Sequence, residues 1–143
     1  MSARMRTVKS FNFTYGRVEV TAQLPKGDWI WPAIWMLPTD NAYGTWPASG
    51  EIDIMESRGN GVDCSLGGHD SFGSTLHWGP NWDQDRWDLT HADYKHPSSL
   101  ADEMHVYGLL WTPERLQTYI DTPDNIVLDV NMSDSDFFSK GGW

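Results

Sequence analysis

Short runs of alternating apolar and polar residues, each ended by a turn, constrain the fold of this chain more than any other feature. Residues 15–24 alternate with a period of two, with Val18, Val20 and Ala22 on one side, which is the pattern of a half-buried strand. Pro, Lys, Gly and Asp at 25–28 then end this strand in a turn. The 143 residues contain no clear amphipathic helix and no internal repeat. This pattern predicts an all-β fold, an antiparallel β-sandwich or jelly roll.

Further strands are expected along the rest of the chain. The nearly continuous apolar run 29–37 suits a strand buried on both sides, with Pro32 near its start, where a missing donor matters least. Residues 79–102 are polar and poor in β-branched side chains, so we expect a long loop there. The other predicted strands lie around residues 74–78, 104–111, 115–121 and 126–130.

The segment most informative about function is Glu-Ile-Asp-Ile-Met-Glu at residues 51–56. Side chains alternate along a strand, so Glu51 and Asp53 share one face, whereas Glu56 would point to the other. The two isoleucines between them would face the core. A β-bulge one or two residues before Glu56 would return it to the face of the other acids. We therefore predict a bulged strand that presents three carboxyl groups on one face.

Crowded carboxyl groups repel one another, so neighbouring groups can hold different protonation states at one pH. A glycosidase needs this difference, because one carboxylate acts as nucleophile while another keeps its proton. Two other interpretations of the segment stay open at this point. Acids and isoleucines also alternate in a half-buried strand with a solvated face, and oxygen-rich side chains can bind a metal ion.

Composition narrows the possible functions. The formal charge of −10 disfavours nucleic acid, whose phosphates demand a basic surface. A membrane span of about 18 apolar residues is missing from the sequence, and the first residues lack the apolar core of a signal peptide. Cys64 is the single cysteine, so no internal disulfide can form. Nine tryptophans exceed ordinary usage; about half would fill the core, and the others offer faces on which sugar rings stack.

Four ordered blocks carry a resemblance to a known family. They are Tyr-Gly-Arg-Val-Glu-Val at 15–20, Leu-Pro-Lys-Gly at 24–27, Trp-Pro-Ala-Ile-Trp-Met-Leu-Pro at 31–38 and the stretch 46–56 that ends in the acidic segment. The similarity continues through residues 74–79 and 105–113. These blocks resemble glycoside hydrolase family 16, most closely its laminarinase (endo-1,3-β-glucanase) branch and the related invertebrate β-1,3-glucan-recognition proteins. The resemblance implies a β-jelly roll with a concave substrate cleft, and hydrolysis with retention of configuration.

The resemblance also implies roles for the acids. By position in the family motif, Glu51 would be the nucleophile, and Glu56 would be the general acid and then the general base. Asp53 between them would hold a hydrogen bond or proton that keeps their ionisation states apart. In retaining enzymes the two reactive carboxyl groups lie about 5–5.5 Å apart. The extra residue Met55 is present in the laminarinase branch and absent from the lichenase branch.

Three further residues are candidates for binding the sugar. Trp46, in the loop before the acidic strand, is expected to stack on a sugar ring; a surface tryptophan that closes the loop is the alternative. His77 is expected on a neighbouring strand, hydrogen-bonded to Glu56 or to a sugar hydroxyl, unless it is a satisfied core histidine. Trp31 and Trp35 share one face and are more typical of a core, although Trp35 could line the floor of the cleft.

The resemblance also implies how much of a catalytic domain this chain contains and what it binds. Residues 1–143 would form a partial family 16 catalytic domain, incomplete at both ends, because family members extend further in both directions. The expected partner is a β-glucan polysaccharide or oligosaccharide, with no cofactor, no metal, no nucleic acid and no membrane, and the protein is expected to be a secreted monomer. The alternative is a non-catalytic β-1,3-glucan-binding recognition protein. Such relatives typically replace the acids, which are all present here.

Overall fold

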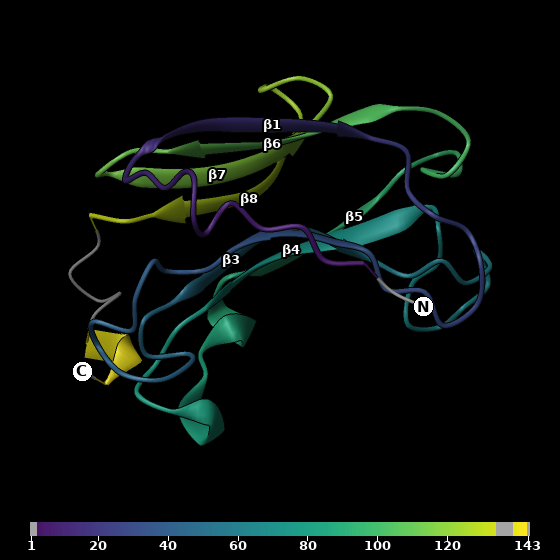
Figure 1. Ribbon diagram of the computed structural model, residues 1–143. Coiled ribbons are helices and arrows are strands. Elements are labelled where there is room, and N and C mark those ends of the chain that lie inside the picture. The colour runs from purple at the N-terminus through teal and green to yellow at the C-terminus, as the bar shows by residue number, and fades with distance from the viewer. Residues whose placement is uncertain (1–2, 134–138, 143) are drawn as a thin grey trace.

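The computed structural model describes residues 3–133 and 139–142, and two antiparallel sheets packed face to face form its body (Figure 1). The first, called here the β1–β8 sheet, contains in spatial order β1 (Gly16–Ala22), β6 (His105–Trp111), β7 (Arg115–Ile120) and β8 (Ile126–Asn131). The second, the β2–β5 sheet, contains β2 (Ala33–Met36), β3 (Glu51–Ser57), β4 (Ser71–His77) and β5 (His91–Lys95). The predicted all-β antiparallel sandwich is confirmed.

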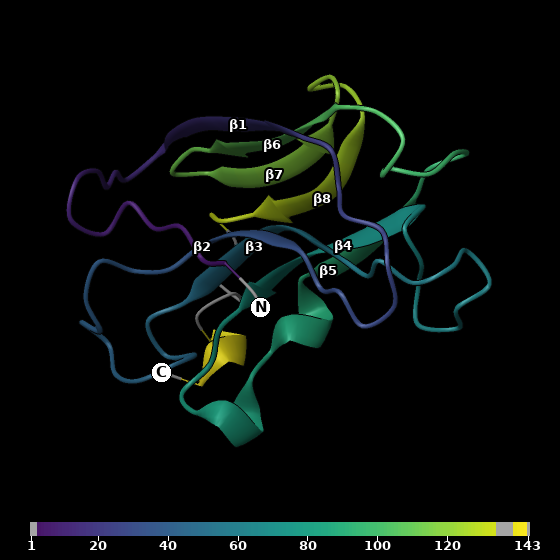
Figure 2. The same cartoon turned by 45° about the vertical axis from the view of Figure 1, so that its right-hand side comes forward.

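Two 3₁₀ helices, η1 (Trp82–Gln84) and η2 (Trp87–Leu89), connect β4 to β5. They lie on the side of the β2–β5 sheet that faces away from the other sheet (Figure 2). Within the described residues, no helix has the length and apolar character that crossing a membrane requires.

The core lies between the two sheets and is built from alternating residues of both. In β4, Phe72 and Leu76 are buried, and in β6, Tyr107 and Leu109 have no exposed surface. Fully burying one such side chain contributes about 1.5–3 kcal/mol. The period-two pattern of the sequence is therefore what assigns each strand an inner and an outer face.

A chain of buried hydroxyl groups crosses this core. Thr118 of β7 donates its Oγ1 hydrogen to Ser74 Oγ of β4 at 2.8 Å, and Ser74 donates to the carbonyl oxygen of Ile54 in β3 at 2.7 Å. Both hydroxyl side chains are fully buried. Buried polar groups are costly unless paired, so this chain fixes the position of the two sheets relative to each other at the middle of β3.

The bulge predicted for β3 is confirmed. Asp53 pairs with Thr75 of β4, and the next recorded pair is Glu56 with Gly73, so three steps along β3 match two along β4. The register between β3 and β2 shifts at the same place. The two residues between the acids are only 2% and 1% exposed and both belong to the core. The extra residue is therefore taken up inside the sandwich, and Glu56 returns to the side of Asp53.

The strand predicted for residues 29–37, buried on both sides, is wrong in extent and in burial. β2 covers Ala33–Met36 alone, and its side chains alternate between exposed and partly buried. Trp29 is 93% exposed and adopts a positive φ of 67°. The physical reason is position: among the described strands, β2 is the first of its sheet and pairs with β3 alone, so its outer face and the turn before Pro32 are open to solvent.

The long loop predicted for residues 79–102 is also corrected, because it contains η1, η2 and strand β5. β5 reads His-Ala-Asp-Tyr-Lys, and Ala92 and Tyr94 pack against the core while the alternate residues face outward. Two inward apolar side chains are too short a pattern to predict a strand from sequence. Pairing with β4 from Ser71 to Thr75 supplies the missing support.

Candidate active site

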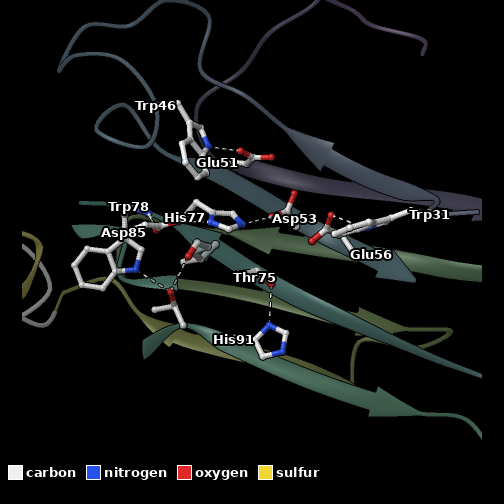
Figure 3. A network of polar contacts seen from close by, with 12 residues as sticks. Trp31, Trp46, Glu51, Asp53, Glu56, Thr75, His77, Trp78, Asp85 and His91 are labelled. Carbon is white, nitrogen blue, oxygen red and sulfur yellow. Dashed lines mark hydrogen bonds and ion pairs between the residues drawn. The ribbon is translucent and has the colours of Figure 1, made fainter. Parts of the chain in front are cut away.

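Three carboxyl groups follow one another along β3 on the outer face of the β2–β5 sheet. Figure 3 shows Glu51, Asp53 and Glu56 on the same side of the strand, with His77 of β4 beside them. Asp53 is 2% exposed, whereas Glu51 and Glu56 are partly buried. Oxygen atoms of Asp53 and Glu56 and a nitrogen of His77 all lie within 4.8 Å of one another. The same three residues could hold a metal ion, although acidic groups crowd together for other reasons as well.

At one end of the row, Glu51 accepts a hydrogen bond from the indole nitrogen of Trp46. Trp46 belongs to a tight loop, in which Ala48 N donates to the Thr45 carbonyl at 2.9 Å. Burial, followed by the nearby charge of Asp53, raises the pKa of Glu51 to about 7. The Trp46 N–H and the charge of neighbouring His77 act in the opposite direction, because both favour the ionised form.

At the other end, Glu56 accepts a hydrogen bond from the indole nitrogen of Trp31 at 3.0 Å. The guanidinium of Arg58 lies 4.9 Å from the centre of a Trp31 ring and donates to the Leu66 carbonyl at 2.7 Å. Burial and then the charge of Asp53 raise the pKa of Glu56, and the Trp31 N–H opposes that rise. Trp31 was predicted as a core residue; this is wrong, because it is 62% exposed and holds a carboxyl group of the site.

His77 joins the centre of the row to a fourth acid. Its Nε2 lies 3.3 Å from Asp53 Oδ2, and its Nδ1 lies 2.6 Å from Asp85 Oδ2. Burial lowers the pKa of His77, but the hydrogen bonds to Asp53 and Asp85 outweigh it and raise the pKa to about 9. His77 is therefore an imidazolium at neutral pH. Its recorded partners are Asp85, through a hydrogen bond, and Asp53, through an ion pair, in place of the expected Glu56.

The sequence placed Trp35 and Trp46 near the acids, and the structure brings both to one pocket. A hollow of about 420 Å³ is lined by Trp35, Trp46 and Glu51, among other residues. Trp35 pairs with Asp53 across the β2–β3 ladder, so it lies on the face of the acids rather than in the core. The guanidinium of Arg4 lies 4.5 Å from the centre of a Trp35 ring and covers one side of it.

Sequence reasoning missed two residues of this site. Trp31 was assigned to the core because it lies in an apolar run; the proline that follows it was the available signal that the regular strand starts later. Asp85 gave no signal, because it lies in a polar segment and reaches His77 only because the chain turns back through η1 after β4. Asp85 also accepts a hydrogen bond from the backbone N–H of Trp78 at 3.2 Å, which fixes its carboxylate.

Comparison with known families agrees with this geometry. Residues 1–137 match the family described as Glycosyl hydrolases family 16. The chain belongs to glycoside hydrolase family 16. The family suggested by the four sequence blocks is thereby confirmed.

Two curated relatives of this family 16 chain carry different names. A "Beta-1,3-glucan-binding protein" of Penaeus monodon is 50% identical over 141 residues, which are 98% of this chain and 38% of that protein. A "Glucan endo-1,3-beta-glucosidase A1" of Niallia circulans is 41% identical over 122 residues, which are 84% of this chain and 17% of that protein. The chain thus spans well under half the length of either relative.

The solved structures agree on the fold of the family. The laminarinase catalytic domain from Thermotoga maritima superposes with a TM-score of 0.74 at 27% identity, covering 93% of this chain and 49% of that one. The catalytic domain of an endo-1,3-beta-glucanase (laminarinase) from Thermotoga petrophila gives a TM-score of 0.73 at 26% identity, with 92% and 48% covered. This family 16 chain therefore shares the jelly-roll sandwich of laminarinases.

Proposed function

We propose that the protein is a retaining glycoside hydrolase that cleaves β-1,3-glucans of the laminarin type by double displacement. The observation that carries the proposal is the row of three carboxyl groups on one face of the bulged strand, with the pKa of Glu51 and of Glu56 raised by burial and by Asp53. Neighbouring carboxyl groups with raised pKa values beside a hollow lined by tryptophans fit this chemistry.

In the first step, the ionised Glu51 attacks the anomeric carbon and forms a covalent ester while Glu56 gives its proton to the departing glycosidic oxygen. In the second step, Glu56 takes a proton from water, the water oxygen attacks the same carbon, and the bond to Glu51 breaks. Two inversions give net retention. The Trp46 N–H and the positive charge of His77 favour the ionised Glu51 that the first step consumes.

Asp53 and His77 support the two reacting groups. The negative charge of Asp53 raises the pKa of both glutamates, and this favours the protonated Glu56 that serves as acid. His77 is held by Asp85 at 2.6 Å, so its positive charge stays beside Asp53 as the charge of the site changes. The predicted separation of about 5–5.5 Å between the reacting carboxyl groups stays a prediction.

The pocket beside Glu51 supports sugar binding. Trp35 and Trp46 line it, and indole rings offer the broad apolar faces on which the C–H face of a pyranose packs. The proposed ligand is a β-1,3-linked glucan chain or oligosaccharide. Because this polymer is extracellular, we further propose that the protein is secreted. We also propose that it acts as a monomer. The proposed chemistry needs no cofactor.

A second function, non-catalytic recognition of β-1,3-glucan on the same fold, is favoured by one specific observation. The Penaeus monodon relative, 50% identical, is named a binding protein. The retained acids of β3 favour the hydrolase, because a pure binding site has no need of three crowded carboxyl groups, two of which, Glu51 and Glu56, have raised pKa values.

One experiment separates the two functions. Release of reducing sugar from laminarin is measured for the full-length protein, for Glu51→Ser, and for Glu103→Gln as an exposed control; lichenan and agarose run in parallel. Turnover that Glu51→Ser abolishes and Glu103→Gln keeps supports the hydrolase. Binding of laminarin in a titration, without turnover by the unaltered protein, would establish recognition and overturn the hydrolase.

A further inference from the structure

Two histidines and an aspartate form a second cluster, which shares no residue with the row of acids on β3. His96 directly follows β5, His105 begins β6, and Asp121 directly follows β7. One nitrogen of each histidine and one carboxylate oxygen of Asp121 all lie within 4.8 Å of one another. Since β5 belongs to one sheet and β6 and β7 to the other, this cluster joins the two sheets.

His105 is the buried member, with 5% of its surface exposed. Its Nδ1 lies 3.1 Å from Asp121 Oδ2. Its Nε2 is buried and has no hydrogen-bond partner among the residues that the structure describes. A buried polar atom without a partner costs roughly 1–3 kcal/mol. The carboxylate holds the proton on Nδ1 and leaves a lone pair on Nε2, which is the arrangement found at metal-binding histidines.

His96 lies against this imidazole, and the two ring centres are 4.8 Å apart with an angle of 67° between the planes. Its Nδ1 lies 3.0 Å from the carbonyl oxygen of Ser98. The N–H of Ser98 also donates to this Nδ1 at 3.2 Å, and the Ser98 hydroxyl oxygen lies 3.1 Å from it. Asp121 therefore supplies an oxygen acceptor for the His105 nitrogen that does not bind a metal, and Ser98 holds the His96 ring beside it.

Asp121 is positioned by the backbone around it. Its φ is 64°, a left-handed conformation that is costly for a residue with a side chain. Its N–H donates to the Val106 carbonyl at 2.8 Å, and its Oδ1 accepts from the Val106 N–H at 3.1 Å. The carboxylate is thus fixed beside His105, where it supplies negative charge to balance a cation.

We propose that His96, His105 and Asp121 form a binding site for one divalent transition-metal ion of the zinc type, with a nitrogen ligand from each histidine and the carboxylate as the charged partner. Imidazole nitrogens select zinc, copper or nickel over calcium and magnesium, which prefer oxygen. Ligand atoms around zinc at about 2.0–2.1 Å lie roughly 3.4 Å apart. The cluster therefore contracts on binding, and the partly exposed His96 is the member that moves.

The consequence of the site is a cross-link between the sheets. An ion held by His96 and His105 ties the end of β5 to the beginning of β6, at positions that face the interior of the sandwich. A ligand that binds the folded protein alone stabilises it according to its concentration and affinity. We therefore expect zinc to raise the thermal unfolding midpoint without entering the hydrolytic steps.

The test uses the full-length protein. A chelator first strips any bound metal from it, and the chelator is then removed. Zinc binding is measured by isothermal titration, and Co²⁺ is used as a spectroscopic probe of nitrogen ligation. His96→Gln is the main variant, because His96 is partly exposed and its replacement leaves the buried His105 in place. His77→Gln is the matched control, because it disables the second His-and-acid cluster, that of Asp53, Glu56 and His77.

We expect His96→Gln to bind one zinc equivalent fewer than the unaltered protein. Zinc should raise the unfolding midpoint of the unaltered protein by several degrees and leave that of His96→Gln unchanged. His77→Gln should keep both the zinc stoichiometry and the zinc-dependent rise in unfolding midpoint. Asp121→Asn is expected to weaken zinc binding by roughly 10–100-fold, the usual effect of removing a group that orients a ligand. Equal zinc stoichiometry in the unaltered protein and His96→Gln, or a loss confined to His77→Gln, would overturn the proposal.

Discussion

At the scale of single residues, each end of the acidic row carries an indole N–H that donates to a carboxylate. Trp46 donates to Glu51 and Trp31 donates to Glu56. Both hydrogen bonds favour the ionised form and oppose the effect of burial. The protonation states of the two glutamates therefore depend on tryptophans as well as on the spacing of the acids, and sequence spacing alone does not give them.

Replacing Trp31 with Phe keeps an aromatic ring and removes the hydrogen bond. Without that donor, the pKa of Glu56 rises further, so on the proposed mechanism the alkaline limb of the kcat/KM profile moves to higher pH. A hydrogen bond to a charged group contributes about 1.5–3 kcal/mol, less for so exposed a side chain, so we expect kcat/KM at neutral pH to change by roughly tenfold or less. Trp29→Phe, at a residue 93% exposed, is the control. An unshifted limb in Trp31→Phe would contradict this role.

Glu51→Gln tests the raised pKa through stability. The folded protein holds the Glu51 proton up to about pH 7, whereas the unfolded chain releases it near 4.5. Its contribution to stability is therefore fully present below pH 4.5 and is lost as the pH rises through 7. This rise in pKa corresponds to about 3 kcal/mol, and partial exposure reduces the effect to roughly 1–2 kcal/mol.

Urea unfolding of Glu51→Gln and of the unaltered protein at pH 4 and pH 8 measures this effect. We expect Glu51→Gln to be more stable than the unaltered protein at pH 8, with the difference disappearing at pH 4. Glu103→Gln, at an exposed position, should show the same difference at both pH values. A constant difference for Glu51→Gln would show that its pKa is not raised.

At the scale of strands, period-two alternation predicted most of what is observed. β1, β6, β7 and β8 lie where the alternating runs predicted them. The bulge in β3 was also predictable, because Glu51, Asp53 and Glu56 cannot share a face without it. β5 was not predictable, because it has only two inward apolar residues and its support comes from β4, which is distant in sequence. The prediction that Trp31 is a core residue was wrong for a related reason. Hydropathy indicates burial, whereas the indole of Trp31 is exposed and donates a hydrogen bond to Glu56.

The bulge gives a prediction about β3 as an element. Deleting Met55 leaves Glu51, Asp53 and Glu56 at strict two-residue spacing, so all three still share one face of a strand without a bulge. The deletion removes a side chain that is 1% exposed, and losing a buried methionine costs about 2–5 kcal/mol. We therefore expect lower stability with hydrolysis of laminarin retained within roughly 100-fold.

Deleting Ile52 is the matched contrast in the same strand. It makes Glu51 adjacent to Asp53, and a one-residue slip turns a side chain to the opposite face. Activity should fall by more than roughly a thousandfold while circular dichroism still reports a folded β protein. Equal loss of activity in the two deletions, with both folded, would show that the bulge itself is required for catalysis.

At the scale of the whole molecule, the two sheets are joined by apolar packing and by the hydroxyl chain from Thr118 through Ser74 to Ile54. This chain ends on the carbonyl of a bulge residue, directly behind the acids. The backbone N–H of Leu128 in β8 also donates to Thr118 Oγ1 at 3.2 Å. One hydroxyl group of the β1–β8 sheet thus bonds to buried polar groups in two other strands, and through Ser74 it supports β3 from the side opposite the site.

Thr118→Val is nearly isosteric and tests this link. It leaves the Leu128 N–H without this partner and removes the donor to Ser74, which keeps its own bond to the Ile54 carbonyl. One buried unsatisfied group costs about 1–3 kcal/mol, so we expect urea unfolding to show a loss of roughly that size. Thr21→Val, on an exposed position of β1, should be neutral, and Thr118→Ser should keep most of the stability. Combining Thr118→Val with Ser74→Ala should cost less than the sum of the two single changes, because the partners are removed together. Strict additivity would mean that the sheets are held at this point by packing alone, and that the bulge of β3 does not depend on the hydroxyl chain behind it.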